Sequence, residues 1–164
     1  MKVEIDLSGR IEKTEEGSAL AFASKKNIES YSVFISGWHK RRLLHELRKK
    51  DYLPETLHLK IFCGLLFFLL EPYWPKISTV VLDQEYTGKE GGIFILLEEI
   101  FKAHGLIIKK ENFCVRRIGK ISPAHKKALV TFRDLRKAGK IISSKAVLEV
   151  LSRKKIGSLR TSPV

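Results

Sequence analysis

Two aspartates of the chain stand at or near the ends of short apolar runs: Asp6 within residues 3–9 and Asp83 within residues 80–86. A carboxylate at the end of a buried strand is unfavourable unless another group compensates its charge. One divalent cation could compensate both carboxylates if the two strands lie side by side. The alternative for each aspartate is an ordinary turn residue, because aspartate is common where a strand meets a turn.

The elements around the two aspartates predict that their strands are neighbours. Residues 2–7, 19–24 and 31–36 are short strand-like runs with brief polar turns between them, which is typical of an antiparallel meander. Residues 77–82 are rich in β-branched side chains and predict a fourth strand, buried on both faces. Because crossovers between parallel strands are right-handed, this strand can lie parallel to the first, at the open side of the meander.

The remaining pattern predicts one α/β domain over residues 1–152. A fifth strand is expected over residues 113–118. Helical spacing and end signals predict helices over residues 40–50, 54–70, 93–104, 124–137 and 145–152. Residues 153–164 are basic and are expected to form a mobile tail.

This order of elements resembles the ribonuclease H-like superfamily of nucleases, integrases and resolvases. Three short motifs carry the resemblance: residues 5–10 with Asp6, residues 82–86 with Asp83, and residues 119–128 with His125. The resemblance covers about residues 1–140 and implies a five-stranded mixed sheet flanked by helices. By its size and its basic C-terminal half, the chain is also similar to the small archaeal single-strand exonucleases of this fold.

The resemblance implies hydrolysis of phosphodiester bonds by two Mg²⁺ or Mn²⁺ ions. It implies that Asp6 bridges the ions, while Asp83 and His125 each bind one. The family usually has an acid at the third position, but some branches have histidine there. The alternative for His125 is an ordinary surface histidine in the first turn of a helix.

Two glutamates are further candidates for this metal site. Glu85 alternates with Asp83 on one strand face, so it is either a ligand or an exposed partner of a lysine. The family's additional glutamate, which precedes the fourth strand on a helix, has no clear match in this chain. Glu55 and His58 both stand at about the right place.

The positive charge is concentrated in the C-terminal part of the chain. The net charge is +13: residues 1–101 carry 14 Lys/Arg against 15 Asp/Glu, and residues 102–164 carry 17 against 3. Such asymmetry favours a polyanionic partner, most often nucleic acid, with anionic lipid or a merely solvated basic face as alternatives. The candidate phosphate contacts around the third motif are Arg116, Arg117, Lys120, Lys126 and Lys127.

Other classes of protein fit the sequence less well. Cys63 and Cys114 lie in apolar stretches without zinc-site spacing, so we expect small core residues in a protein of the reducing cytoplasm. No signal peptide is visible, and the longest apolar run, residues 61–70, is too short to span a bilayer, so no membrane association is expected. That run is core or, in part, the interface of a homo-oligomer. Trp38, Tyr73 and Trp74 either stack on unpaired bases or pack in the fold.

The leading hypothesis is therefore a metal-dependent nuclease that cuts DNA or RNA, with single strands favoured and exonuclease action included. A Holliday-junction resolvase of the same superfamily is an alternative, which predicts a two-fold dimer. A nucleic-acid-binding module that kept the fold and lost the site is another, and the missing fourth carboxylate motivates it.

Overall fold

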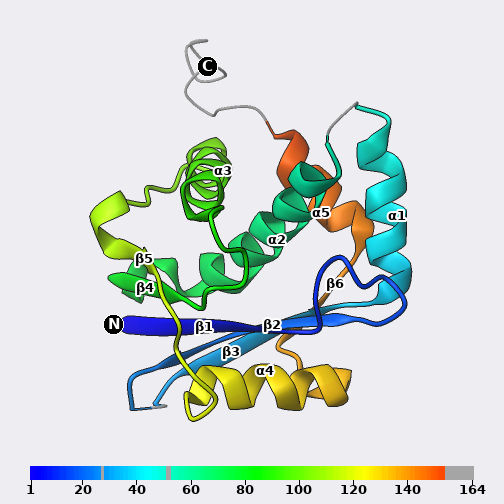
Figure 1. Cartoon of the computed structure of the whole chain (residues 1–164). Helices are drawn as coiled ribbons and strands as arrows, with labels where there is room; N and C mark the ends of the chain where they lie inside the picture. Colours follow the sequence, from blue (N-terminus) through cyan, green and yellow to red (C-terminus); the bar gives the residue numbers. More distant parts are fainter. Residues whose placement is uncertain (27, 51–52, 154–164) are drawn as a thin grey trace.

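The computed structural model describes residues 1–26, 28–50 and 53–153, which contain a six-stranded mixed sheet in the order β5-β4-β1-β2-β3-β6 (Figure 1). The antiparallel meander consists of β1 (Lys2–Ser8), β2 (Ser18–Ser24) and β3 (Ser30–Ile35). The strands that join in parallel are β4 (Thr79–Leu82), β5 (Phe113–Val115) and β6 (Lys140–Ile142). The α/β class and the parallel pairing of β4 with β1 are confirmed.

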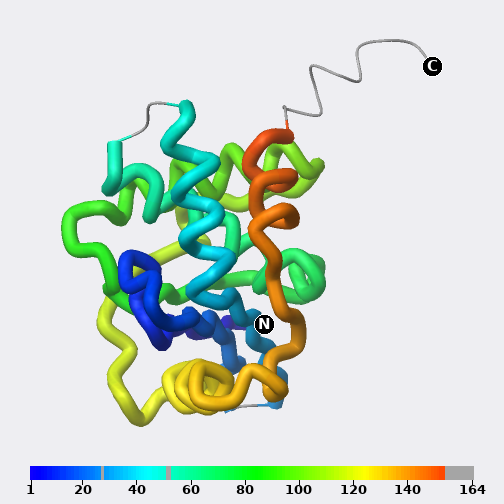
Figure 2. Tube along the Cα trace, turned by 90° about the vertical axis from the view of Figure 1, so that its right-hand side faces the viewer, coloured from blue at the N-terminus to red at the C-terminus, as the bar shows by residue number. Residues whose placement is uncertain are grey.

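Helices cover both faces of the sheet, as Figures 1 and 2 show. One face carries α4 (Pro123–Arg133), which contacts the meander strands. The opposite face carries α1 (Gly37–Arg48), α2 (Pro54–Leu70), α3 (Glu90–Ala103) and α5 (Ser144–Ser152). Three short 3₁₀ helices complete the elements: η1 (Glu71–Lys76), η2 (Lys110–Asn112) and η3 (Leu135–Lys137). Of the predicted basic tail, residues 154–164 lie outside the described residues.

The prediction of five strands was wrong, because β6 adds a sixth strand within the described residues. β6 pairs in parallel with β3 over Val33–Ile35 at the edge of the sheet. It is three residues long, and of these Ile142 alone is buried. So short a run carries no detectable alternation, and its pairing is set by contacts with β3 rather than by its own sequence.

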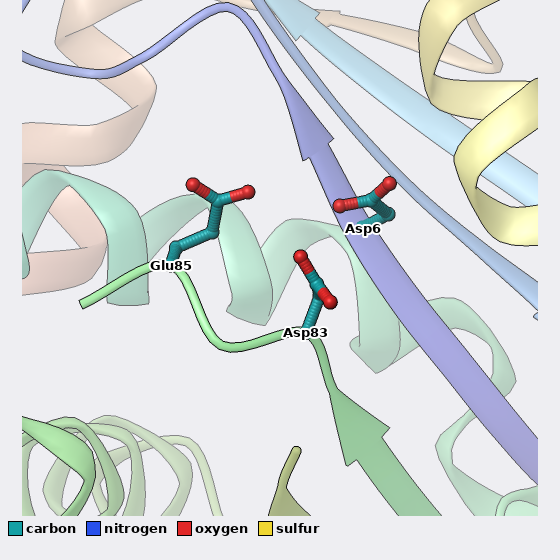
Figure 3. Close-up of side chains that lie close together, drawn as sticks. All are labelled: Asp6, Asp83 and Glu85. Carbon is teal, nitrogen blue, oxygen red and sulfur yellow. The ribbon is translucent and has the colours of Figure 1, made fainter. Parts of the chain in front are cut away.

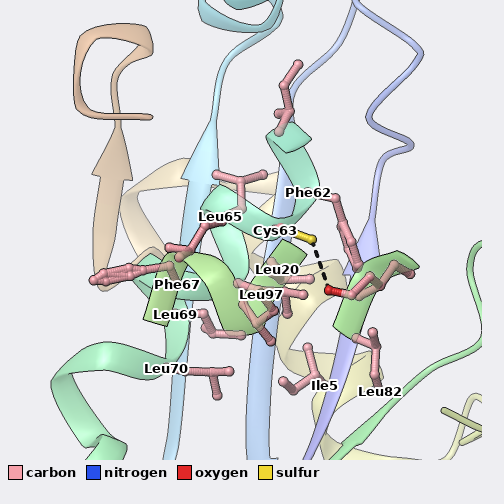
Figure 4. Packing of buried hydrophobic residues seen from close by; sticks show 14 of the residues in the cluster. Ile5, Leu20, Phe62, Cys63, Leu65, Phe67, Leu69, Leu70, Leu82 and Leu97 are labelled. Atoms are coloured by element: carbon pink, nitrogen blue, oxygen red, sulfur yellow. Dashed lines mark hydrogen bonds between the residues drawn. The ribbon is translucent and has the colours of Figure 1, made fainter. Parts of the chain in front are cut away.

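The core lies between the sheet and α2, whose residues 61–70 are buried except for Phe68 (Figure 4). The core interpretation of this run is therefore confirmed. The segment Pro54–Lys76 is long and apolar enough to cross a membrane by length and composition, but it is weak evidence for a span, since 56% of the relevant window is buried inside the fold. Cys63 is buried in this helix, donates to the Ile93 carbonyl at 3.6 Å, and has its thiol pKa raised by burial.

Cys114 corrects another prediction, because it is exposed rather than a core residue. It lies on β5, the strand at the other edge of the sheet. Its neighbours Phe113 and Val115 point to the opposite face and are buried or half-buried there. An apolar stretch on an edge strand can thus have one face in solvent, which the sequence does not reveal.

A buried lysine fixes the β1–β2 loop, which leads away from Asp6. Lys40 of α1 is fully buried, and its ammonium donates to the Arg10 carbonyl at 3.0 Å, the Lys13 carbonyl at 2.7 Å and Ser18 Oγ at 2.8 Å. Burial lowers the pKa of Lys40 to about 8. The ammonium thus satisfies two carbonyls of this loop and the hydroxyl of Ser18, the first residue of β2.

We expect Lys40→Met to lower the free energy of unfolding by about 2–4 kcal/mol, because the three acceptors lose their donor. Urea denaturation measures this loss. Lys145→Met, at an exposed position of α5, is the control and should change stability by less than about 0.5 kcal/mol. Equal stability of the two variants would contradict a structural role for the Lys40 ammonium.

Candidate metal centre

The pairing of β1 with β4 brings Asp6 and Asp83 together. Ile5 lies opposite Leu82 in this parallel pair, and the Asp83 N–H donates to the Ile5 carbonyl at 2.9 Å. Side chains alternate along a strand, so Ile5 and Leu7 face the core while Asp6 leaves the other face, toward α4. The two carboxylates predicted from the sequence therefore meet where β4 ends beside β1: Asp83 directly follows β4, and Asp6 lies within β1, one residue beyond Ile5.

Glu85 completes a cluster of three carboxylates, shown in Figure 3. Among the described residues, one ligand oxygen each from Asp6, Asp83 and Glu85 lies within 4.8 Å of the others. Glu85 does not lie on a strand face, as the sequence suggested, because β4 ends at Leu82. Instead, its N–H donates to the Asp83 carbonyl at 2.9 Å, which closes a tight turn that directs Glu85 back toward the aspartates.

Hydrogen bonds hold the two aspartates in place. Asp6 Oδ1 accepts from the Leu7 N–H at 2.8 Å, and Asp83 Oδ1 accepts from the Ile118 N–H at 2.9 Å. His125 Nδ1 lies 2.6 Å from Asp6 Oδ2. These bonds orient the carboxylates, as partners of metal ligands do in metalloproteins.

His125 reaches Asp6 from the first turn of α4. Ser122 caps this helix by accepting from the Ala124 N–H at 3.2 Å, and Pro123 occupies the first helical position. His125 thus stands beside the three carboxylates as a hydrogen-bond partner of Asp6. Its role as a metal ligand stays a prediction.

The cluster is electrostatically strained without a cation. Asp6 is only 4% exposed, and burial raises its pKa, although the bonds from His125 and Leu7 offset part of this. Burial first, and then the charges of Asp6 and Asp83, raise the pKa of Glu85 to about 7. A divalent cation would relieve this repulsion, and carboxylate oxygens are the ligands that Mg²⁺ and Mn²⁺ prefer. The residues present therefore fit such an ion.

Glu55, the other predicted carboxylate, lies apart from this cluster. Its side chain is 67% exposed and pairs with Lys89 at 3.2 Å. It lines a separate hollow of about 170 Å³. The other lining residues of that hollow are Glu12, His58, Leu59, Tyr86 and Lys89.

The five predicted phosphate contacts lie on residues 116–127, the segment that follows β5 and includes the start of α4. Arg116, Arg117, Lys120 and Lys126 are exposed and Lys127 is half-buried. The same segment supplies Ile118 and His125 to the carboxylates. Lys126 and Lys127 also line a hollow of about 370 Å³ together with Ser30, Pro123 and Val130. These cations are thus close in sequence to the residues that contact Asp6 and Asp83.

Two of the three aromatic candidates are packing residues. The Tyr73 ring lies 5.1 Å from Phe22, and Trp74 packs edge-on against Phe101 at 4.7 Å. Trp38 on α1 is 57% exposed and stays a candidate for base stacking.

Sequence reasoning missed two cations near the centre, Lys2 and Lys25, which share a hollow with Glu4 and Arg116. The alternation along β1 could have indicated Lys2, because it lies on the strand face of Asp6. Both lysines lie in residues 1–101, whose net charge is close to zero, so the charge count did not indicate them.

No protein-family model, curated protein or solved structure matches this chain. The fold and the geometry of the carboxylate cluster therefore carry the functional interpretation.

Proposed function

We propose that the protein is a metal-dependent nuclease of ribonuclease H-like fold, which hydrolyses phosphodiester bonds of DNA or RNA and favours single strands. The observation that carries this proposal is the convergence of Asp6, Asp83 and Glu85 within 4.8 Å. The order of elements over the first five strands supports the fold assignment, with β6 as an addition at the sheet edge.

The residues of the chain have distinct roles in this proposal. Mg²⁺ or Mn²⁺ held by Asp6 and Asp83, with Glu85 or His125 completing the set, would activate a water and stabilise the leaving oxygen. His125 orients the Asp6 carboxylate, and the Ile118 N–H orients that of Asp83. Such hydrogen bonds to metal-ligating carboxylates fix the orientation of the ligands.

The basic segment has the task of positioning the strand to be cut. Phosphate contacts fix the register of a nucleic acid without reading its sequence. Arg116 and Lys126 flank, in the sequence, the residues that contact the two aspartates, Ile118 and His125, so we assign them to contacts with phosphates of the strand to be cut. The surplus of positive charge in residues 102–164 supports the same role.

Labelled single strands, duplexes and four-way junctions, each incubated with Mg²⁺, Mn²⁺ or EDTA, test this function. We expect cleavage with either metal ion, none with EDTA, and the fastest cleavage on single strands. Preferential cutting of junctions would replace the proposal with a resolvase. Binding that is steeply salt-dependent, with no cleavage under either metal, would contradict it and indicate a non-catalytic module.

A further inference from the structure

A small concave site of about 210 Å³ lies on the same face of β1 as Asp6 and is lined by Lys2, Glu4, Lys25 and Arg116. We name it the cationic pocket. We propose that the cationic pocket binds a phosphate one or two nucleotides away from the scissile one, on an unpaired strand. This inference rests on the proposed nuclease function, because it places the pocket relative to the bond that is cut.

The register of β1 sets the distance between the pocket and the metal centre. Lys2, Glu4 and Asp6 alternate along β1, so their side chains leave the same face of the sheet. Glu4 lies two residues from Asp6 along β1, about 7 Å, and Lys2 lies four residues away, about 13 Å. These spans are of the order of one and two nucleotide steps in an extended chain. A strand whose scissile phosphate lies at Asp6 would therefore bring a phosphate one or two steps away to the pocket.

Three elements converge to build the pocket. Val3 pairs with Ser24, so Lys25 follows β2 at the level of Lys2. Arg116 follows β5, and its N–H donates to the Leu82 carbonyl at 3.0 Å, one residue before Asp83. The pocket and the metal centre thus share β1, and Arg116 lies beside the end of β4, which Asp83 follows.

The charge of the pocket suits an anion although it contains one carboxylate. Glu4 accepts from Ser122 Oγ at 2.8 Å, and its other oxygen lies 3.8 Å from Arg116 Nη2. Within the described residues, Lys2 and Lys25 form no ion pair. Three cations therefore face a single carboxylate that already has two partners, which leaves an uncompensated charge of +2 for a phosphate.

An adjoining hollow indicates that the bound strand is unpaired. This hollow of about 340 Å³ shares Lys2 and Lys25 with the cationic pocket and is also lined by Ile28, which is 79% exposed. Its remaining lining residues are Met1, Ser24, Lys26 and Glu29. An apolar side chain beside two ammonium groups suits a base next to its phosphate. A base can enter such a hollow only when it is not paired with a second strand.

Binding of a fluorescent single strand in EDTA, followed by anisotropy at several salt concentrations, tests the pocket without cleavage. We expect Lys2→Gln/Lys25→Gln to weaken binding about tenfold and to reduce the salt slope by about 0.7, the value for one phosphate of a single strand. Ile28→Ser should weaken binding several-fold and leave the salt slope unchanged, because it removes an apolar contact. Circular dichroism verifies that the variants fold.

Lys49→Gln/Lys145→Gln is the matched control, since it removes two exposed lysines, one directly after α1 and one on α5, both helices of the opposite face of the sheet. An equal loss in control and pocket variants, or an equal loss on single strands and duplexes, would overturn the inference. If the pocket variants bind normally while the wild type cleaves with Mn²⁺, the proposal that the cationic pocket binds a phosphate is wrong and the nuclease assignment stands. Weakened binding by the pocket variants, with no cleavage by the wild type, would instead overturn the nuclease assignment.

Discussion

Asp83→Asn is expected to slow metal-dependent cleavage by at least about a thousandfold, which corresponds to about 4 kcal/mol of lost transition-state stabilisation. The amide removes the charge that holds a divalent cation. Its oxygen can still accept from the Ile118 N–H, so the local geometry is retained. Single-turnover rates on a labelled single strand at saturating Mn²⁺ measure the effect.

Glu98→Gln is the control for this variant. Glu98 lies on α3, where it pairs with Lys102 at 3.9 Å, and the substitution removes the same charge from the surface. It should leave the cleavage rate unchanged within about twofold, because the loss of a surface charge outside the metal centre does not affect cation binding. Cleavage by Asp83→Asn at the control's rate would contradict the assignment of Asp83 to the metal centre.

The melting temperature of Asp83→Asn gives a second test, which does not depend on nuclease activity. In the metal-free protein the charge of Asp83 raises the pKa of both Asp6 and Glu85, so the three carboxylates repel one another. Removing one charge relieves this repulsion. We expect the metal-free melting temperature to rise by about 2–4 °C, as a gain of about 1 kcal/mol gives in a chain of this size.

The second large effect is a dependence of stability on pH that Mn²⁺ reverses. Glu85 has an ordinary pKa of 4.5, which the fold raises to about 7. Between these values the folded state binds a proton that the unfolded state has lost, so the free energy of unfolding decreases as the pH rises. We expect a loss of about 2 kcal/mol between about pH 4.5 and 7, less than the full shift because Glu85 is partly exposed.

Mn²⁺ should reverse this dependence, because the cation binds the ionised carboxylates. At about a hundredfold excess over the dissociation constant, it should add about 2.7 kcal/mol near pH 8 and far less near pH 5. Urea denaturation at both pH values, with and without Mn²⁺, measures the difference. Glu85→Gln is the control and should flatten the metal-free profile; a profile that keeps its slope in this variant would contradict the role of Glu85.

Much of the fold could be predicted because its signals are local or topological. The meander follows from period-two alternation, and the buried α2 from its uniformly apolar sequence. The adjacency of Asp6 and Asp83 follows from the handedness of the crossover, which restricts where β4 can pair. This rule alone was enough to predict that the two aspartates are neighbours.

The remaining features depend on contacts that the sequence does not encode locally. Glu85 reaches the cluster through a turn bond to the Asp83 carbonyl, and His125 turns to Asp6 because α4 packs on β1. The three-residue strand β6 is too short for any periodicity. Lys2 and Lys25 meet Arg116 only through the sheet register, which a count of charges along the chain cannot detect.

Anomalous diffraction from a crystal soaked in Mn²⁺ tests the metal centre most directly. We predict a peak between Asp6 and Asp83, with carboxylate oxygens at about 2.0–2.2 Å and either Glu85 or His125 as a further ligand. Well-ordered carboxylates without any peak at saturating Mn²⁺, or an ion bound only elsewhere on the protein, would contradict the account.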